Sequence, residues 1–179
     1  MKPFKTIYVL AIGASVICAQ SVCAQTKPQL TDPEIASVAV TANQVDINYA
    51  KIAQSKSKDA DVLQFAQTMA KDHQGVIDQA VALVKKLNVT PKDNAVSKKL
   101  NSDADKTKKT LNAKTGKDFD KAYIDNEVAY HKAVISTVQD VLIPESQNAE
   151  LKGLLQNVLP VLKTHLEHAE MVQKKVTSK

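Results

Sequence analysis

Hydrophobic side chains recur every three to four residues along four long stretches of the chain, and this spacing predicts four amphipathic α-helices. The predicted helices cover residues 33–53, 58–87, 117–143 and 147–175. Thr31 and Glu34 have the spacing of a capping box at the start of the first helix. Pro144 marks the end of the third of these helices. No stretch alternates between hydrophobic and polar residues as a strand would, so the pattern indicates an all-α protein.

The first two long helices are joined tightly, as are the last two, with Ser57 and Ser146 as their predicted N-caps. Residues 88–116 form a long link between the two pairs, and residues 93–113 within it have the weaker pattern of a shorter surface helix. Two helical hairpins joined by a long crossover are typical of a ferritin-like four-helix bundle. An up-and-down bundle with a fifth surface helix is the alternative.

The first 24 residues have the pattern of a cleaved secretory signal peptide. Lys2 and Lys5 precede an apolar run that is too short for a membrane anchor, and Val22 and Ala24 predict cleavage before Gln25. Residues 25–32 would be a flexible N-terminal segment and residues 33–175 one helical domain without a transmembrane segment. We therefore expect a protein of the periplasm or of the periplasmic face of the outer membrane.

Both cysteines, Cys18 and Cys23, lie within this predicted signal. Neither follows a small residue, which disfavours cleavage and lipidation as a lipoprotein. Removal of the signal leaves no thiol, so disulfide and thiolate chemistry are excluded from the predicted mature chain.

The charge of the chain argues against a nucleic-acid partner. All 24 basic residues are lysines, and without Lys2 and Lys5 the remaining 22 stand against 19 acidic residues, a net charge of +3. The sequence has no arginine to form paired hydrogen bonds with phosphate or guanine. Tryptophan is absent and other aromatic residues are few, so there is little surface on which bases could stack.

Three histidines fall on the apolar faces of three different predicted helices, each near the middle of its helix. These are His73, His131 and His165, and Asp46 and Glu127 lie at similar heights. Because antiparallel helices of similar length place their midpoints side by side, these five side chains can converge in the bundle. Imidazole and carboxylate groups together suit one divalent transition metal, namely Zn, Fe, Mn or Cu. Glu127 would orient His131 by accepting its other N–H.

Two other interpretations of these residues stay open. The histidines can be core polar groups whose hydrogen bonds fix the register of the helices. A di-iron carboxylate centre is disfavoured, because that site requires Glu-x-x-His motifs that the sequence lacks. His168 follows His165 by one turn and is expected to lie closer to the surface. With no nucleophile motif and no phosphate-binding glycine loop, we expect no enzymatic activity.

Four stretches in order resemble an exported bacterial family catalogued as domain of unknown function 4142. They are Ala-Asn-Gln-Val-Asp-Ile at 42–47 with Ala50-Lys51-Ile52-Ala53; Phe65-Ala66 with Met69 and Asp72-His73; Phe119-Asp120 with Ala122-Tyr123 and His131; and Leu159-Pro160 with His165-Leu166 and Ala169. The resemblance covers residues 33–174 and implies a ferritin-like helical fold, but it implies little about function. The family tends to have Asp-His in both hairpins, whereas the second pair here is Tyr130-His131.

The sequence thus predicts an exported helical bundle that binds a divalent metal or another small ligand through His73, His131, His165, Asp46 and Glu127. The alternative is a structural or stress-related protein of the cell envelope, with an envelope protein as its partner, whose histidines serve packing alone.

Overall fold

A computed structural model describes residues 29–178, and every regular element in this range is helical. The long helices are α1 (Asp32–Lys56), α2 (Ala60–Lys86), α3 (Ala95–Asn112), α4 (Gly116–Thr137) and α6 (Ala149–Thr177). A π-helical turn, η1 (Val138–Leu142), and the short α5 (Ile143–Glu145) continue from α4. The all-α prediction is confirmed. The predicted signal peptide, its cleavage site and both cysteines lie outside the described residues.

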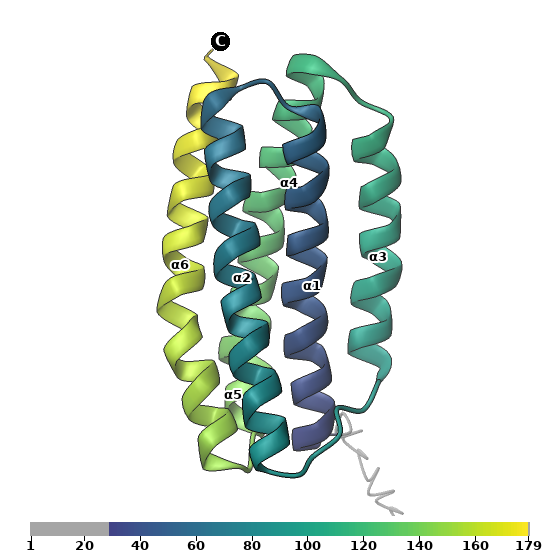
Figure 1. Ribbon diagram of the computed structural model, residues 1–179, viewed down its shortest axis with the longest axis vertical. Helices are drawn as coiled ribbons and strands as arrows, with labels where there is room; N and C mark the ends of the chain where they lie inside the picture. The colour runs from purple at the N-terminus through teal and green to yellow at the C-terminus, as the bar shows by residue number, and fades with distance from the viewer. Residues whose placement is uncertain (1–28, 179) are drawn as a thin grey trace, which may run out of the picture.

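Four helices stand side by side with antiparallel neighbours, and α3 lies outside them (Figure 1). Helix α1 packs against α2, α3 and α4, while α6 packs against α4 and α2. The chain leaves α2 at the lower end of the bundle in Figure 1, climbs through α3, and enters α4 at the upper end. Helix α3 therefore carries the chain along the length of the bundle between the two hairpins.

The first helix begins with the predicted pair of residues. The Glu34 carboxylate accepts hydrogen bonds from the Thr31 backbone N–H at 3.0 Å and from the Thr31 hydroxyl at 2.8 Å. These bonds lower the pKa of Glu34 to about 2. Asp32 connects the start of α1 to the second hairpin. Its carboxylate accepts hydrogen bonds from the backbone N–H groups of Gln147 and Asn148, both at 2.9 Å.

The predicted N-caps Ser57 and Ser146 are wrong, because α2 and α6 each begin further along the chain. Asp59 caps α2 by accepting the N–H groups of the first turn at 3.0 and 3.3 Å. Asn148 caps α6 in the same way at 2.9 and 3.0 Å. The Ser57 hydroxyl instead accepts the Asp59 backbone N–H at 3.1 Å and so supports the cap.

The helical stretch that begins with α4 passes Pro144 by one residue instead of ending before it. In η1 the Ile143 N–H donates to the Val138 carbonyl, five residues earlier. This wider turn departs from the ordinary α-helical ladder just before Pro144, which has no N–H to contribute. The backbone therefore stays helical across the proline.

Two apolar clusters fill the bundle, one above the other, with a polar layer between them. On α1, Val38 belongs to the lower cluster and Tyr49 to the upper one, with Asp46 between them. On α6, Leu162 belongs to the lower cluster and Ala169 to the upper one, with His165 between them. The sequence of each helix thus sets polar residues at one height of the core.

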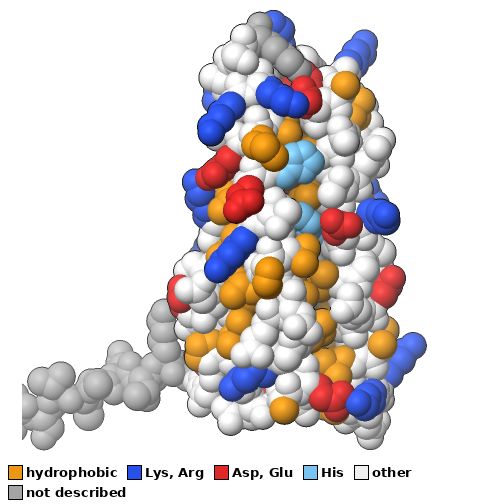
Figure 2. Space-filling model, turned by 90° about the vertical axis from the view of Figure 1, so that its left-hand side faces the viewer, with side chains coloured by type: hydrophobic (Ala, Val, Ile, Leu, Met, Phe, Trp, Pro, Cys, Tyr) orange, Lys and Arg blue, Asp and Glu red, His pale blue; other side chains and the backbone are white. Residues whose placement is uncertain are grey.

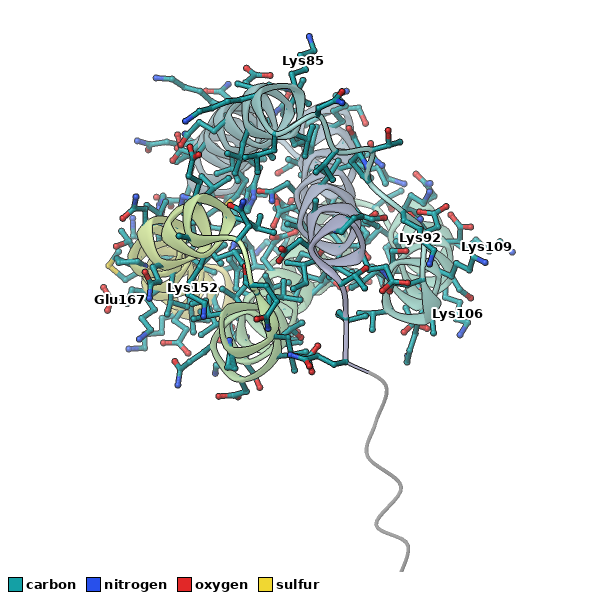
Figure 3. The ribbon with its side chains drawn as sticks, turned by 90° about the horizontal axis from the view of Figure 1, so that it is seen from below. Lys85, Lys92, Lys106, Lys109, Lys152 and Glu167 are labelled. Carbon is teal, nitrogen blue, oxygen red and sulfur yellow. The ribbon has the colours of Figure 1, made fainter. Side chains whose placement is uncertain are left out.

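Charged side chains surround this core. Viewed along the bundle axis, Lys85, Lys106, Lys109 and Glu167 point outward from the helices (Figure 3). Among the described residues, no helix combines the length and hydrophobicity needed to cross a membrane.

Candidate metal centre

Each of the four inner helices contributes to the polar layer. Helix α1 supplies Asp46, α2 supplies His73, α4 supplies both Glu127 and His131, and α6 supplies His165. Asp46 and Glu127 are fully buried, and the three histidines are between 1% and 5% exposed. The five residues selected from the sequence therefore lie in the core at one height.

The three imidazole rings face one another. Ring centroids are 5.2 Å apart between His73 and His165, and 5.7 Å apart for each of the other two pairs. One ring nitrogen from each histidine lies within 4.8 Å of one from each of the others. This spacing can place three nitrogen ligands around a single ion.

The ring of His73 is held by Asn43, one turn before Asp46 on α1. The His73 Nδ1 atom lies 2.7 Å from Asn43 Oδ1. Because the Asn43 amide nitrogen donates to the Ala39 carbonyl at 2.8 Å, Oδ1 is left as an acceptor and His73 Nδ1 carries the donated proton. His73 Nε2 then keeps its lone pair.

The other two rings are held in the same way by acceptors. His131 Nδ1 donates to the Glu127 backbone carbonyl at 3.0 Å, and His165 Nε2 donates to an Asp72 carboxylate oxygen at 3.1 Å. The remaining nitrogens, His131 Nε2 and His165 Nδ1, are buried without a hydrogen-bond partner, as is His73 Nε2. All three histidines thus have one nitrogen anchored and one free, which is how metal-ligating imidazoles are oriented.

Asp46 lies against two of these free nitrogens. Its Oδ2 atom is 3.3 Å from His73 Nε2 and 3.6 Å from His131 Nε2. Asp46, Glu127 and His131 form a second group whose potential ligand atoms lie within 4.8 Å of one another. Neither Asp46 oxygen accepts a hydrogen bond, and the Asn126 side chain lies close enough to the Glu127 carboxyl to act against the rise in its pKa.

Burial sets the protonation of the cluster. Burial raises the pKa of Asp46 to about 8 and raises that of Glu127 well above its usual range, with the nearby Asp46 as a second cause. Burial also lowers the pKa of His131 to about 4 and lowers those of His73 and His165. The histidines are therefore neutral near pH 7, with lone pairs available to a metal.

These features together describe a site that can hold a cation. Neutral imidazole nitrogens and the carboxyl oxygens point together in the buried core, and no backbone N–H, amide or hydroxyl group of the described residues donates to the free nitrogens. Leaving buried polar atoms without partners costs free energy, on the order of 1–3 kcal/mol for each group. A divalent ion among them would remove that cost.

The structure differs from the sequence-based hypothesis in how the rings are oriented. The Glu127 carboxylate lies 3.6 Å from His131 Nδ1, and the backbone carbonyl of Glu127 takes the hydrogen bond instead. A residue bonded to the carbonyl four positions earlier on its own helix needs no side-chain acceptor. His168 stays outside the cluster, half-buried, with its ring edge-on to Phe65 at 5.1 Å between centroids.

Asn43 and Asp72 orient the rings of His73 and His165, and the sequence alone did not identify them for this role. Asn43 precedes Asp46 by three residues, so its place on the same helix face was a usable signal. Asp72 neighbours His73 in sequence, but its partner is His165 on a different helix. No sequence spacing predicts that contact.

Comparison with known proteins identifies the family of this chain but no relative of established function. No curated protein and no solved structure matches the chain. A family model described as "Domain of unknown function (DUF4142)" matches residues 18–172. The match covers most of the sequence, and the chain therefore belongs to the DUF4142 family.

Proposed function

We propose that this protein is an exported bacterial envelope protein with a ferritin-like bundle that binds one divalent transition metal ion. His73, His131 and His165 are the nitrogen ligands, Asp46 is the carboxylate ligand, and Glu127 supports the site. Zn²⁺, Fe²⁺, Mn²⁺ and Cu²⁺ are the candidate ions, since imidazole and carboxylate suit all four.

One observation carries this proposal. Each of the three converging histidine rings has one nitrogen held by a hydrogen bond and one nitrogen that is free. A core that used histidines only for packing would satisfy both ring nitrogens or place each ring apart. Here the free nitrogens and the Asp46 carboxylate oxygens are buried without partners. Lone pairs that face one another without a donor between them call for a proton or a metal ion.

The second candidate function is structural, in an envelope protein that meets other envelope proteins. The separate hydrogen bonds of the rings to Asn43, to the Glu127 carbonyl and to Asp72 favour it. Such bonds can fix helix register without any ion. They leave the free nitrogens unexplained, so we place this function second.

Elemental analysis of the mature protein, purified without a histidine tag or chelator, tests the proposal. We expect about one transition metal ion per chain, and calorimetric titration of the stripped protein with Zn²⁺ and Cu²⁺ should show one tight site. His131→Ala and His165→Ala should each weaken binding at least 100-fold. If no metal copurifies and none binds more tightly than millimolar, the structural function stands instead.

His168→Ala is the matched control for His165→Ala. It removes a histidine from the same helix, one turn further on and outside the cluster. We expect it to leave the stoichiometry and affinity of metal unchanged. Equal losses in the two variants would mean that metal binds at the surface of α6 rather than in the core.

A further inference from the structure

The lower half of the bundle contains a cavity of about 70 Å³ beneath the polar layer. Its walls come from α1, α2, α3, α4, η1 and α6. Most of the lining is aliphatic, including Ala80, Leu155 and Val158. Several of the lining residues, such as Val76 and Leu154, are only partly buried.

The candidate metal centre forms one end of this cavity. Asp46, His73 and His131 all line it. These side chains are at most 3% exposed, and they carry the unpartnered Asp46 oxygens and the free Nε2 atoms of both histidines. An occupant of the cavity would therefore touch the same atoms that would hold the ion.

The size of the cavity decides which molecules fit. A water molecule needs about 10–15 Å³ of such space, and an apolar cavity of about 150 Å³ holds benzene or xenon. At about 70 Å³, the space is too small for an acyl chain or a ring compound but suits a diatomic molecule or a single xenon atom. Away from the Asp46, His73 and His131 end, the aliphatic walls offer no hydrogen bonds to replace hydration, so a charged occupant is disfavoured there.

We propose that the cavity holds a small uncharged apolar molecule, of the size of dioxygen, against the Asp46, His73 and His131 face of the metal centre. The role of the bound molecule depends on the proposed metal site. Its binding in the cavity does not. A neutral ligand the size of a gas molecule would reach the metal ligands through this apolar cavity rather than through water.

Entry to the cavity would be beside α6, where partly exposed side chains line it. In Figure 2, hydrophobic side chains form a strip down the lower half of this face, beneath histidine side chains that reach the surface. Val76 on α2 and Val158 on α6 line the cavity and are partly exposed. Small motions of such side chains would admit a gas-sized molecule.

Xenon is the probe for the metal-free protein, read by methyl NMR shifts and by the resonance of ¹²⁹Xe. We expect saturable shifts at Leu155 and Val158 methyl groups and none at the methyl groups of the upper cluster. Val158→Phe should weaken xenon binding at least tenfold by filling the space. Val161→Phe is the matched control, because Val161 is 41% exposed on the same helix and does not line the cavity.

Ala80→Leu fills the cavity from α2 and serves as the second variant if Val158→Phe does not fold. In protein loaded with Co²⁺, the bound xenon should show a paramagnetic shift, because the cavity ends at the metal ligands. No saturable shift in wild type, equal binding in Val158→Phe and Val161→Phe, or no paramagnetic shift in a protein that binds Co²⁺ would overturn the proposal. Failure of Co²⁺ to bind would overturn the metal site alone, since xenon binding is measured without metal.

Discussion

At the level of single residues, burial imposes an electrostatic cost on the charged forms of Asp46 and Glu127, which are both fully buried. Their carboxyl groups avoid that cost in the metal-free protein by staying protonated. A metal ion would instead stabilise the charged form. The same two residues therefore link metal binding, protonation and stability.

The stability of the metal-free protein should fall as pH rises from 6.5 to 8. The pKa of Asp46 is about 8 in the folded protein against 3.8 for the free side chain, so the folded state holds a proton that the unfolded state has lost. The free energy of unfolding should fall by roughly 1–2 kcal/mol over this range. Urea denaturation of stripped protein at several pH values measures it.

The histidines act only below pH 6.5, where their effect opposes that of Asp46, which extends from pH 8 down to about pH 4. The pKa of His131 is about 4, below its ordinary 6.5, so protonation of the unfolded state lowers stability as pH falls from 6.5 towards 4. Above pH 6.5 only the carboxyl effect remains. Asp46→Asn should therefore make the decrease between pH 6.5 and 8 smaller and leave the Glu127 contribution, whereas Asp78→Asn, at an exposed position on α2, should keep the wild-type decrease. An unchanged slope in Asp46→Asn would contradict the raised pKa.

Metal affinity should rise with pH for the same reason. Because Asp46 must lose its proton to bind an ion, the affinity for Zn²⁺ should increase up to about tenfold per pH unit between pH 6 and pH 8. Above the pKa of about 8, the Asp46 contribution to this increase should level off. Calorimetry in buffers of different ionisation enthalpy counts the protons released. Release of no proton at pH 7 would argue that Asp46 is not a ligand.

At the level of the helices, side-chain caps fix where α2 and α6 begin and therefore the heights of His73 and His165. Asn148 accepts two backbone N–H groups at the start of α6 and its own N–H donates to Asp32 of α1. The cap thus joins the two hairpins at the lower end of the bundle. It sets the start of the helix that carries His165.

Removing this cap should destabilise the fold without removing the metal site. Asn148→Ala should lower the free energy of unfolding by about 1 kcal/mol, because two N–H groups lose their acceptor. Gln156→Ala, at an exposed position of α6, is the control and should change stability by less than about 0.5 kcal/mol. Urea denaturation measures both. A loss in the control as large as that in Asn148→Ala would show that the cap is not the cause.

At the level of the whole molecule, four helices meet at the candidate metal centre, so an ion bound there would link both hairpins. Metal at 100 times its dissociation constant should stabilise the folded state by about 2.7 kcal/mol. For a domain of this size, that corresponds to a rise in melting temperature of about 5–10 °C. Calorimetric melting of wild type and His131→Ala with and without Zn²⁺ measures it. A similar rise in both proteins would point to binding elsewhere.

Export to the periplasm is a further prediction for the whole molecule. Mass spectrometry of protein from the periplasmic fraction should find Gln25 at the N-terminus, because Val22 and Ala24 lie at the two positions before the cut that match a signal cleavage site. An acylated cysteine at the N-terminus would show a lipoprotein instead. An intact Met1 in a cytoplasmic fraction would contradict export altogether.

The sequence by itself determined the helical class and the helices to within a few residues at their ends, because the spacing of apolar residues is a local property of each helix. It also selected five polar residues at matching heights, since each lies on an apolar face near the middle of its helix. His73 is one such residue, at the centre of a regular apolar pattern in α2.

Only the tertiary structure decided how those residues meet. The contact of His165 with Asp72 joins α6 to α2, and that of His73 with Asn43 joins α2 to α1. Such contacts depend on how far each helix is rotated about its own axis against its neighbour, which no periodicity within one helix can give. The cavity beneath the cluster arises in the same way, because its volume is what remains after side chains from separate helices have packed together.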